Sequence, residues 1–232
     1  MKWLKRILAI ALLPSCAAAT LTAWDVARRL LPTAGDNVSL AFCGGYLLWL
    51  VIFVVLPKPT RTYILGHELT HAFWALLMGA RVSGLKVGKN SGQVRTSKSN
   101  WLITLAPYFF PFYAMLFMAL FFIAHLIWNL TAWFWVLFLL TGIGWSFHVT
   151  FTLMLLLTVA QPDLKSQGYL FSAVIIYLMN LLTILVTAGA LSPTLRFADL
   201  GATAWKHLLL SYGWTLDNLA ALWQHIAHAI GH

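Results

Sequence analysis

The chain has little charge of either sign. Only 9% of its 232 residues are Asp, Glu, Lys or Arg, whereas a typical soluble domain has about 25%. A soluble protein could not cover its surface with so few charges. Hydrophobic residues make up 61% of the chain, and several apolar runs exceed the roughly 20 residues that span a bilayer. We therefore expect an all-α integral membrane protein embedded in the lipid bilayer.

Other absences narrow the function further. The net charge is +9, but no basic run is interleaved with aromatic residues, so we expect no nucleic-acid partner. The two cysteines, Cys16 and Cys43, lie in apolar runs, where a thiol is usually an inert small side chain. We also see no internal repeat. Many transporters have inverted repeats, so this absence disfavours a transporter.

The first apolar run, residues 3–31, follows Lys2, Lys5 and Arg6. It resembles a signal peptide, and the stretch 13–16 faintly resembles a lipoprotein cleavage site. A proline directly before Ser-Cys is unusual in such a site. The residues favour an uncleaved helix in residues 1–37 that is embedded in the membrane or lies on its surface.

The next segments alternate between apolar and polar. Residues 38–56 predict a membrane span that ends at Pro57 and Pro59. A second membrane helix is expected from about Arg61 to Leu77 or Met78, capped by Gly79. Residues 80–99 are polar and rich in glycine. Loose alternation from 82 to 87, a turn at 90–92 and a return over 93–97 predict a small β-hairpin.

The remaining runs complete the count. Residues 101–127 are apolar but contain Pro107 and Pro111, which predicts a kinked or broken helix. Residues 131–160 are longer than one span needs, with a possible bend at 142–144, and residues 168–191 are the last clear span. The tail 194–232 has apolar residues at helical spacing, which favours an amphipathic helix on the membrane surface. The sequence predicts five or six membrane helices in a single membrane domain, 1–232.

The chemistry is concentrated in His67-Glu68-Leu69-Thr70-His71. His67 and His71 are four residues apart, so they project from one face of a helix and both imidazoles can reach one Zn²⁺. Glu68 is the only glutamate in the chain. It can reach a zinc-bound water, whose pKa the metal lowers, and act as the general base that activates it. Three ionisable side chains in five apolar-helix residues are costly without a shared purpose.

A catalytic zinc normally has a third protein ligand and an open position. Two residues are candidates. His148 lies inside the 131–160 run at a depth that matches His67, if the helix over 61–79 and the two runs after it all cross the membrane. Asp163 lies just beyond the end of the same run. His148 could instead be an outer partner, a transition-state donor or a packed core histidine, and depth alone favours it over Asp163.

At this point the sequence resembles the site-2 protease family, the M50 intramembrane metalloproteases. The match rests on Gly66 to His71, on Gly79 to Val82 with the glycine-rich segment after it, on Leu105 to Pro111, and on Pro162-Asp163-Leu164 with Gly168. It covers roughly residues 60–190. The family's third ligand lies in an Asp-Gly motif, whereas here Leu164 follows Asp163. No PDZ-like insertion is present.

The resemblance implies a zinc metalloendopeptidase with one catalytic Zn²⁺ held by His67, His71 and Asp163, and with Glu68 as the catalytic residue. Its substrate would be a membrane protein or peptide, cut within or near the bilayer. The hairpin over 82–97 could then bind an extended substrate by strand addition, or be an ordinary basic loop. The expected location is the bacterial inner membrane, as a multi-pass protein.

The distribution of Lys and Arg predicts how the chain is oriented in the membrane. If residues 80–99 are cytoplasmic and residues 1–37 do not cross, most Lys and Arg lie inside, as the positive-inside rule requires, and the active site opens to the cytoplasm.

Asn180 could orient substrate, but a bond to another helix is favoured. His225, His228 and His232 are a weak metal pattern, better interpreted as solvated. The alternative function is a non-catalytic membrane scaffold or partner-binding protein, which the imperfect third-ligand motif would favour.

Overall fold

The computed structural model describes residues 2–30, 37–88, 91–192 and 194–230. The chain divides into two compact units. The terminal unit consists of residues 1–31 and 170–232, and the central unit of residues 32–169. The single membrane domain therefore stays a prediction.

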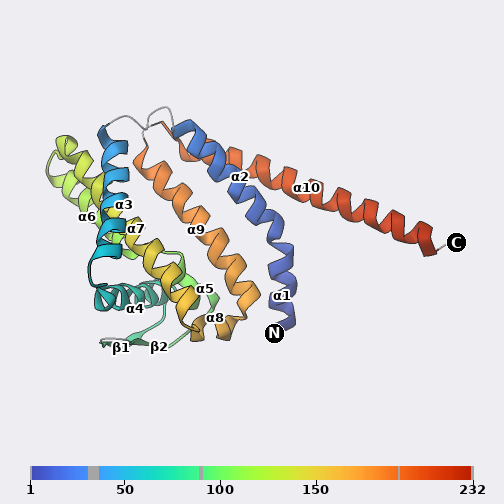
Figure 1. The fold of residues 1–232 in the computed structure, drawn as a ribbon, viewed down its shortest axis with the longest axis horizontal. Coiled ribbons are helices and arrows are strands. Elements are labelled where there is room, and N and C mark those ends of the chain that lie inside the picture. Colours follow the sequence, from blue (N-terminus) through green and yellow to red (C-terminus); the bar gives the residue numbers. More distant parts are fainter. Residues whose placement is uncertain (1, 31–36, 89–90, 193, 231–232) are drawn as a thin grey trace. The chain divides into compact units, whose positions relative to one another are not determined.

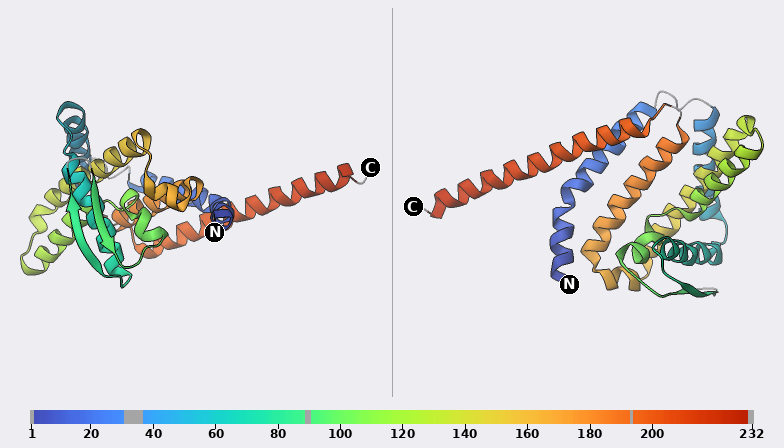
Figure 2. Two further views of the ribbon diagram at one scale, coloured as in Figure 1. Left: turned by 90° about the horizontal axis from the view of Figure 1, so that it is seen from below. Right: turned by 180° about the vertical axis from the view of Figure 1, so that it is seen from behind.

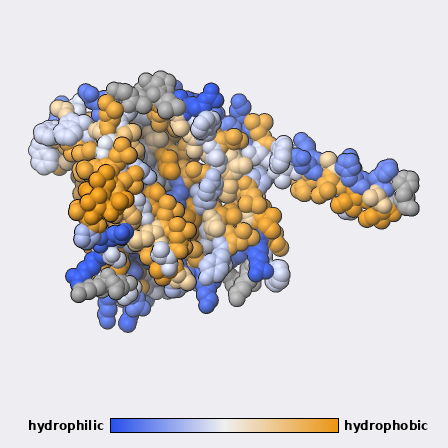
Figure 3. Space-filling view, in the orientation of Figure 1, coloured by the Kyte–Doolittle hydropathy of each residue, from blue (hydrophilic) through white to orange (hydrophobic). Residues whose placement is uncertain are grey.

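The terminal unit is built from four helices: α1 (Lys2–Ala11), α2 (Leu13–Leu30), α9 (Tyr169–Leu191) and α10 (Phe197–Ile230). Its core is formed by Val26, Leu185, Leu195 and Leu200. The first half of α10 packs on α2. Its second half has apolar and polar residues on opposite sides (Figure 3). The amphipathic helix predicted for the tail is therefore present, and its place on the membrane surface stays a prediction.

The central unit contains the rest of the fold (Figure 1). Its elements are α3 (Asn37–Val55), α4 (Thr60–Leu77), β1 (Val82–Val87), β2 (Gly92–Thr96), α5 (Trp101–Leu105), η2 (Ala106–Tyr108), α6 (Phe112–Ile127), η3 (Thr131–Trp133), α7 (Phe134–Thr158) and α8 (Pro162–Gln167). Helix α7 packs on both α3 and α6. One hydrophobic cluster joins Trp49 of α3 and Tyr63 of α4 to Phe147 and Phe151 of α7.

Two glycines let α3 and α7 approach closely. A Cβ added at Gly45 would meet the backbone carbonyl of Leu139, and one at Gly142 would meet that of Phe42. The helix α7 is continuous from Phe134 to Thr158. Gly142, expected as a possible bend, therefore has a packing role, since only a residue without a side chain fits where the two backbones meet.

The proline-bearing run is broken, as predicted. Residues 101–108 and 112–127 form two helical pieces that meet at 88°. Pro107 lies in η2, and Pro111 is the N-cap of α6. Because proline has no N–H to continue the helical ladder, the chain turns here. The turn brings η2 and α5 against α4.

Among the described residues, four helices are long and apolar enough to cross a membrane: 3–30, 37–55, 131–158 and 169–191. The bent pair 101–127 raises the number to five if it is one span. These helices indicate a membrane protein. The upper expectation of six is not met, because α4, expected as a membrane helix, is not among them. It runs across the lower ends of α3 and α7 (Figures 1 and 2).

The predicted β-hairpin is present. Strands β1 and β2 pair antiparallel, with Val87 opposite Gly92 and Leu85 opposite Val94. An irregularity follows between Val82 and Leu85, where Gly84 has a φ of +81°. Both strands contact α4. Of the turn expected at 90–92, residue 90 lies outside the described residues, and Gly92 begins β2.

Candidate metal centre

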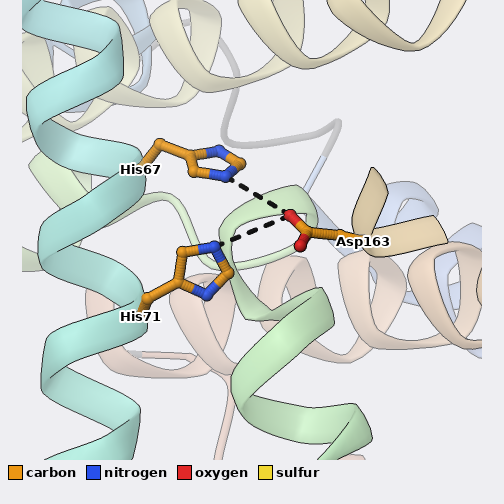
Figure 4. A group of neighbouring side chains, drawn as sticks. All are labelled: His67, His71 and Asp163. Carbon is orange, nitrogen blue, oxygen red and sulfur yellow. Dashed lines mark ion pairs between the residues drawn. The ribbon is translucent and has the colours of Figure 1, made fainter. Parts of the chain in front are cut away.

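Helix α4 carries the His-Glu-x-x-His pentad in its middle. The helix follows Pro59, its N-cap, and ends before Gly79, whose φ of +69° fits the predicted glycine cap. His67 and His71 project from the same side of α4, one turn apart (Figure 4). The local sequence therefore places two imidazoles side by side, as the spacing predicted.

Asp163 approaches the two histidines from α8. It lies in the first turn of that helix, directly after Pro162. One carboxylate oxygen, Oδ2, is 3.7 Å from Nε2 of His67 and 3.6 Å from Nε2 of His71 (Figure 4). Among the described residues these three are the group of His, Cys, Asp or Glu side chains that could hold a metal, with ligand atoms within 4.8 Å of one another.

The distances fit a shared ion better than direct hydrogen bonds. An N–H···O bond has its heavy atoms about 2.7–3.2 Å apart, whereas two ligands on one tetrahedral zinc are about 3.3 Å apart, given zinc–nitrogen distances of about 2.0–2.1 Å. The observed separations of 3.6 and 3.7 Å are close to the second value. Two imidazole nitrogens and a carboxylate oxygen are also a donor set that zinc accepts.

The hydrogen-bond partner of Nδ1 of His71 shows which ring nitrogen carries the hydrogen. Nδ1 of His71 is 2.7 Å from the carbonyl oxygen of Ile103. A carbonyl can only accept, so Nδ1 carries the hydrogen. In a neutral ring, Nε2 then turns a lone pair towards the Asp163 carboxylate. Two acceptors facing each other need a cation between them, either a proton or a metal ion.

The other two side chains of the cluster also have outer partners. Nδ1 of His67 lies 3.4 Å from the hydroxyl of Tyr63, one turn earlier on α4. The hydroxyl of Tyr108 donates to Oδ2 of Asp163 at 3.0 Å and lies 3.2 Å from Oε1 of Gln161. The ring of Tyr108 packs edge-on against His67. Such outer partners orient metal ligands and are expected at a metal site.

Glu68 lies next to the cluster but outside it. The residue is 8% exposed, and its carboxylate accepts a hydrogen bond from the backbone N–H of Val94 in β2. Burial raises the pKa of Glu68, and the neighbouring His67 and His71 only partly oppose that effect. Glu68 is thus a buried carboxylate close to both imidazoles, and it is not one of the three side chains of the cluster.

The pKa values of the cluster show how strongly its members interact. Burial raises the pKa of the Asp163 carboxyl, but the rings of His67 and His71 lower it more, so the net pKa is well below its usual range. For His71, burial lowers the pKa and Asp163 raises it, and the net direction is upward. Negative charge on Asp163 and positive charge between the rings therefore stabilise each other.

A cavity opens beside these residues. Its volume is about 670 Å³, and His67, Glu68, His71 and Asp163 all line it. One wall is apolar and comes from the last turns of α7, and another is formed by β2. The wall residues are Phe151, Met154, Leu155 and Val159 on α7, and Gly92, Gln93, Val94 and Thr96 on β2. The site thus has room for a polypeptide segment next to the cluster.

The structure separates the two candidates for third ligand. His148 is 6% exposed and lines a different, small cavity that it shares with Gly66, Thr70 and His67. It does not belong to the described metal-binding group. The depth argument for His148 assumed that α4 crosses the membrane, and α4 is not among the candidate spans. The geometry therefore favours Asp163.

Three other polar residues singled out in the sequence, Asn180, His225 and His228, belong to the terminal unit. Asn180 donates to the carbonyl of Ile176 in its own helix at 2.8 Å, and the bond expected to another helix stays a prediction. His225 and His228 are exposed on α10 and are not in the described metal-binding group, and His232 lies outside the described residues. Both cysteines are free.

Sequence reasoning missed the outer partners. Tyr63, Tyr108 and the Ile103 carbonyl carry no motif, although Tyr108 lies within the Leu105–Pro111 segment that was singled out for its prolines. The contact between β2 and Glu68 was also missed. No protein-family model, no characterised protein and no solved structure matches the chain.

Proposed function

We propose that the protein is a zinc-dependent endopeptidase that cleaves a membrane-associated polypeptide within or close to the bilayer, as a multi-pass protein of a bacterial inner membrane. One observation carries the proposal. His67 and His71 converge with Asp163 around one point, and the only glutamate of the chain lies beside them on the same cavity.

The roles follow from the chemistry of each group. His67, His71 and Asp163 would hold the metal, which leaves the fourth position open for water or substrate. Zinc bound there supplies a Lewis acid for the peptide carbonyl and lowers the pKa of water to about 7. Glu68 takes the proton from the attacking water and returns it to the leaving amine.

The cavity supports an extended polypeptide as the substrate. The open edge of β2 borders the cavity, and an open strand edge can take up a further strand through main-chain hydrogen bonds. The α7 wall offers apolar surface to the side chains of that strand. A helical membrane segment would have to unwind to bind here, because its backbone groups are otherwise paired within the helix.

The likeness to site-2 proteases is part of the same proposal. It rests on the pentad, the glycine-rich hairpin, the proline-broken helix and the downstream aspartate. The geometry supports Asp163 as third ligand even though the usual glycine does not follow it. Gly168 instead ends α8, with a φ of +94°.

Metal analysis and one substitution test the proposal. Protein extracted in mild detergent should hold one zinc per chain and should cleave fluorescein-labelled casein, with cleavage stopped by 1,10-phenanthroline. The Glu68→Gln variant should keep the zinc and lose at least about 100-fold in kcat, since a general base typically contributes about 10²–10⁴-fold. Unchanged cleavage in that variant would refute the mechanism. Protein without zinc would favour the non-catalytic scaffold instead.

A further inference from the structure

Strand β2 touches Glu68 at a glycine. A Cβ added at Gly92 would lie 2.6 Å from Cγ and 2.8 Å from Oε1 of Glu68, and 2.6 Å from Cγ2 of Ile64. Gly92 does not have a positive φ, so its backbone conformation does not require glycine. Glycine weakens a strand interior and often marks a close approach. Here the close approach is to α4, at the residue proposed as general base.

The hydrogen bonds of the hairpin show which backbone groups of β2 are open. Ser91 accepts from the N–H of Gly88, and the N–H of Ser97 donates to Arg81, so residues 91 and 97 bond towards the β1 side. In an antiparallel ladder the direction alternates along a strand. Gly92, Val94 and Thr96 therefore direct their N–H and C=O groups away from β1, towards the open edge. The contact from the Val94 N–H to Glu68 agrees with this alternation.

We propose that β2 positions the general base: the Val94 N–H holds one oxygen of the Glu68 carboxylate, and Gly92 provides the space that this contact needs. The proposal rests on the proposed function, in which Glu68 is the base. A carboxylate with one oxygen fixed by a donor has a defined plane, so its second oxygen keeps one orientation towards the water it activates. Val94 and Gly92 are positioning residues, since they act through Glu68.

The same arrangement constrains how a substrate strand can bind. The Val94 N–H already faces Glu68, so a strand added to the open edge would bond to Gly92 and Thr96, whose N–H groups point to the same edge. These two residues flank Val94 along β2. A substrate held at both would extend past Glu68, which couples strand binding to the alignment of the base.

Replacing single backbone amides by esters tests the contact directly. An ester at Val94, made by incorporating the α-hydroxy analogue of valine, removes the N–H and leaves the side chain in place. An ester at Arg95 is the matched control, because by the alternation its N–H faces β1. Gly92→Ala tests the space, and Gly44→Ala is its control, since a Cβ at Gly44 would meet nothing within 4 Å.

Glu68 can be observed alone, because it is the only glutamate of the chain. Full-length protein made by cell-free synthesis with [5-¹³C]glutamate should give one carboxyl signal. We expect that signal to shift in the Val94 ester and in Gly92→Ala, and to stay in place in both controls. Zinc content should be unchanged in all four variants. On labelled casein, kcat should fall about 10–100-fold in the first two, since small misplacements of reacting groups can cost about 10²-fold.

The outcomes separate this proposal from the proposed function. A Glu68 signal that does not move in the Val94 ester overturns the proposal, whether or not the chain cleaves casein. So does a kcat at the wild-type value in both the Val94 ester and Gly92→Ala. A wild-type chain that holds zinc and cleaves nothing overturns the proposed function instead, and the Glu68 signal then still decides whether β2 holds this carboxylate.

Discussion

Each unit of the protein contains histidine paired with an aspartate, and the surroundings of the two sites differ: His207 of the terminal unit is buried, whereas His67 and His71 of the central unit are half-buried. In the terminal unit, Nε2 of His207 is 3.4 Å from Oδ2 of Asp25, and its Nδ1 is 3.0 Å from the hydroxyl of Thr22. That hydroxyl donates to the carbonyl of Ala18 at 2.8 Å, so its oxygen accepts from the Nδ1–H. Both nitrogens of His207 thus face protein groups of α2, and the histidine links α10 to α2.

In the central unit two histidines face one carboxylate oxygen. Nε2 of His67 and Nε2 of His71 lie 3.7 and 3.6 Å from the same oxygen of Asp163, beside a cavity. The comparison shows that a His–Asp contact alone does not make a metal site. The central unit differs from the terminal one in three respects: three donors converge, each donor has an outer partner that orients it, and a cavity lies next to them.

Removing one histidine from each pair should give the largest contrast. His71→Ala should lose zinc and all cleavage of labelled casein, because two ligands remain of three. His207→Ala should keep full zinc content, since the described partners of the His207 ring nitrogens lie on α2 of the terminal unit. Zinc measured by mass spectrometry after gel filtration decides the matter. Equal zinc loss in both variants would contradict the assignment of the metal to the central unit.

Zinc itself should stabilise the fold, because a ligand that binds only the folded state adds to its stability. At zinc concentrations of about 100 times Kd the gain is about 2.7 kcal/mol. Thermal unfolding in detergent should therefore shift upward when zinc is added and downward with chelator. The shift should persist in His207→Ala and disappear in His71→Ala. A zinc-dependent shift that survives His71→Ala would place the ion elsewhere.

The outer partner of Asp163 should affect affinity without abolishing binding. Tyr108→Phe removes the hydroxyl that donates to Asp163 and keeps the ring that packs against His67. Loss of an outer partner typically weakens metal affinity about 10–100-fold, which a chelator titration would measure. Tyr113→Phe is the matched control, since that hydroxyl donates at 2.6 Å to the carbonyl of Thr62. Equal affinities in the two variants would refute a role for Tyr108.

The sequence predicted those parts of the site that depend on local spacing. Two imidazoles and a carboxylate within five residues of one helix follow from helical periodicity. The approach of Asp163 to the two histidines was predicted from the family resemblance. Local spacing does not show it, because it depends on how the chain brings α8 close to α4. The depth argument for His148 required α4 to cross the membrane, and α4 is not among the candidate spans of the described residues. An apolar run predicts that a helix forms, but packing against the other elements decides how that helix is oriented.

The contacts that complete the site could not be predicted for the same reason. Tyr108 reaches Asp163 across 55 positions of sequence, and no periodicity records such a contact. The sequence predicted Gly92 as part of a turn, because a glycine after Asn-Ser is a turn signal. Its contact with Glu68 arises from the docking of the hairpin on α4. The broken helix over 101–127 was predicted correctly, because proline acts on its own backbone.

The smallest expected effect concerns the terminal unit. Thr22→Val keeps the shape of the side chain but leaves the Nδ1–H of His207 without the oxygen that accepts it. A lost hydrogen bond of this kind costs about 1 kcal/mol, or more if the donor stays unpaired. The cost should appear as a lower unfolding midpoint with unchanged zinc affinity. Thr183→Val is the control, because the Thr183 hydroxyl donates at 2.6 Å to Met179 in its own helix. A loss no larger than that of the control would mean that His207 does not need Thr22, and the two histidine sets would then differ less than their geometry indicates.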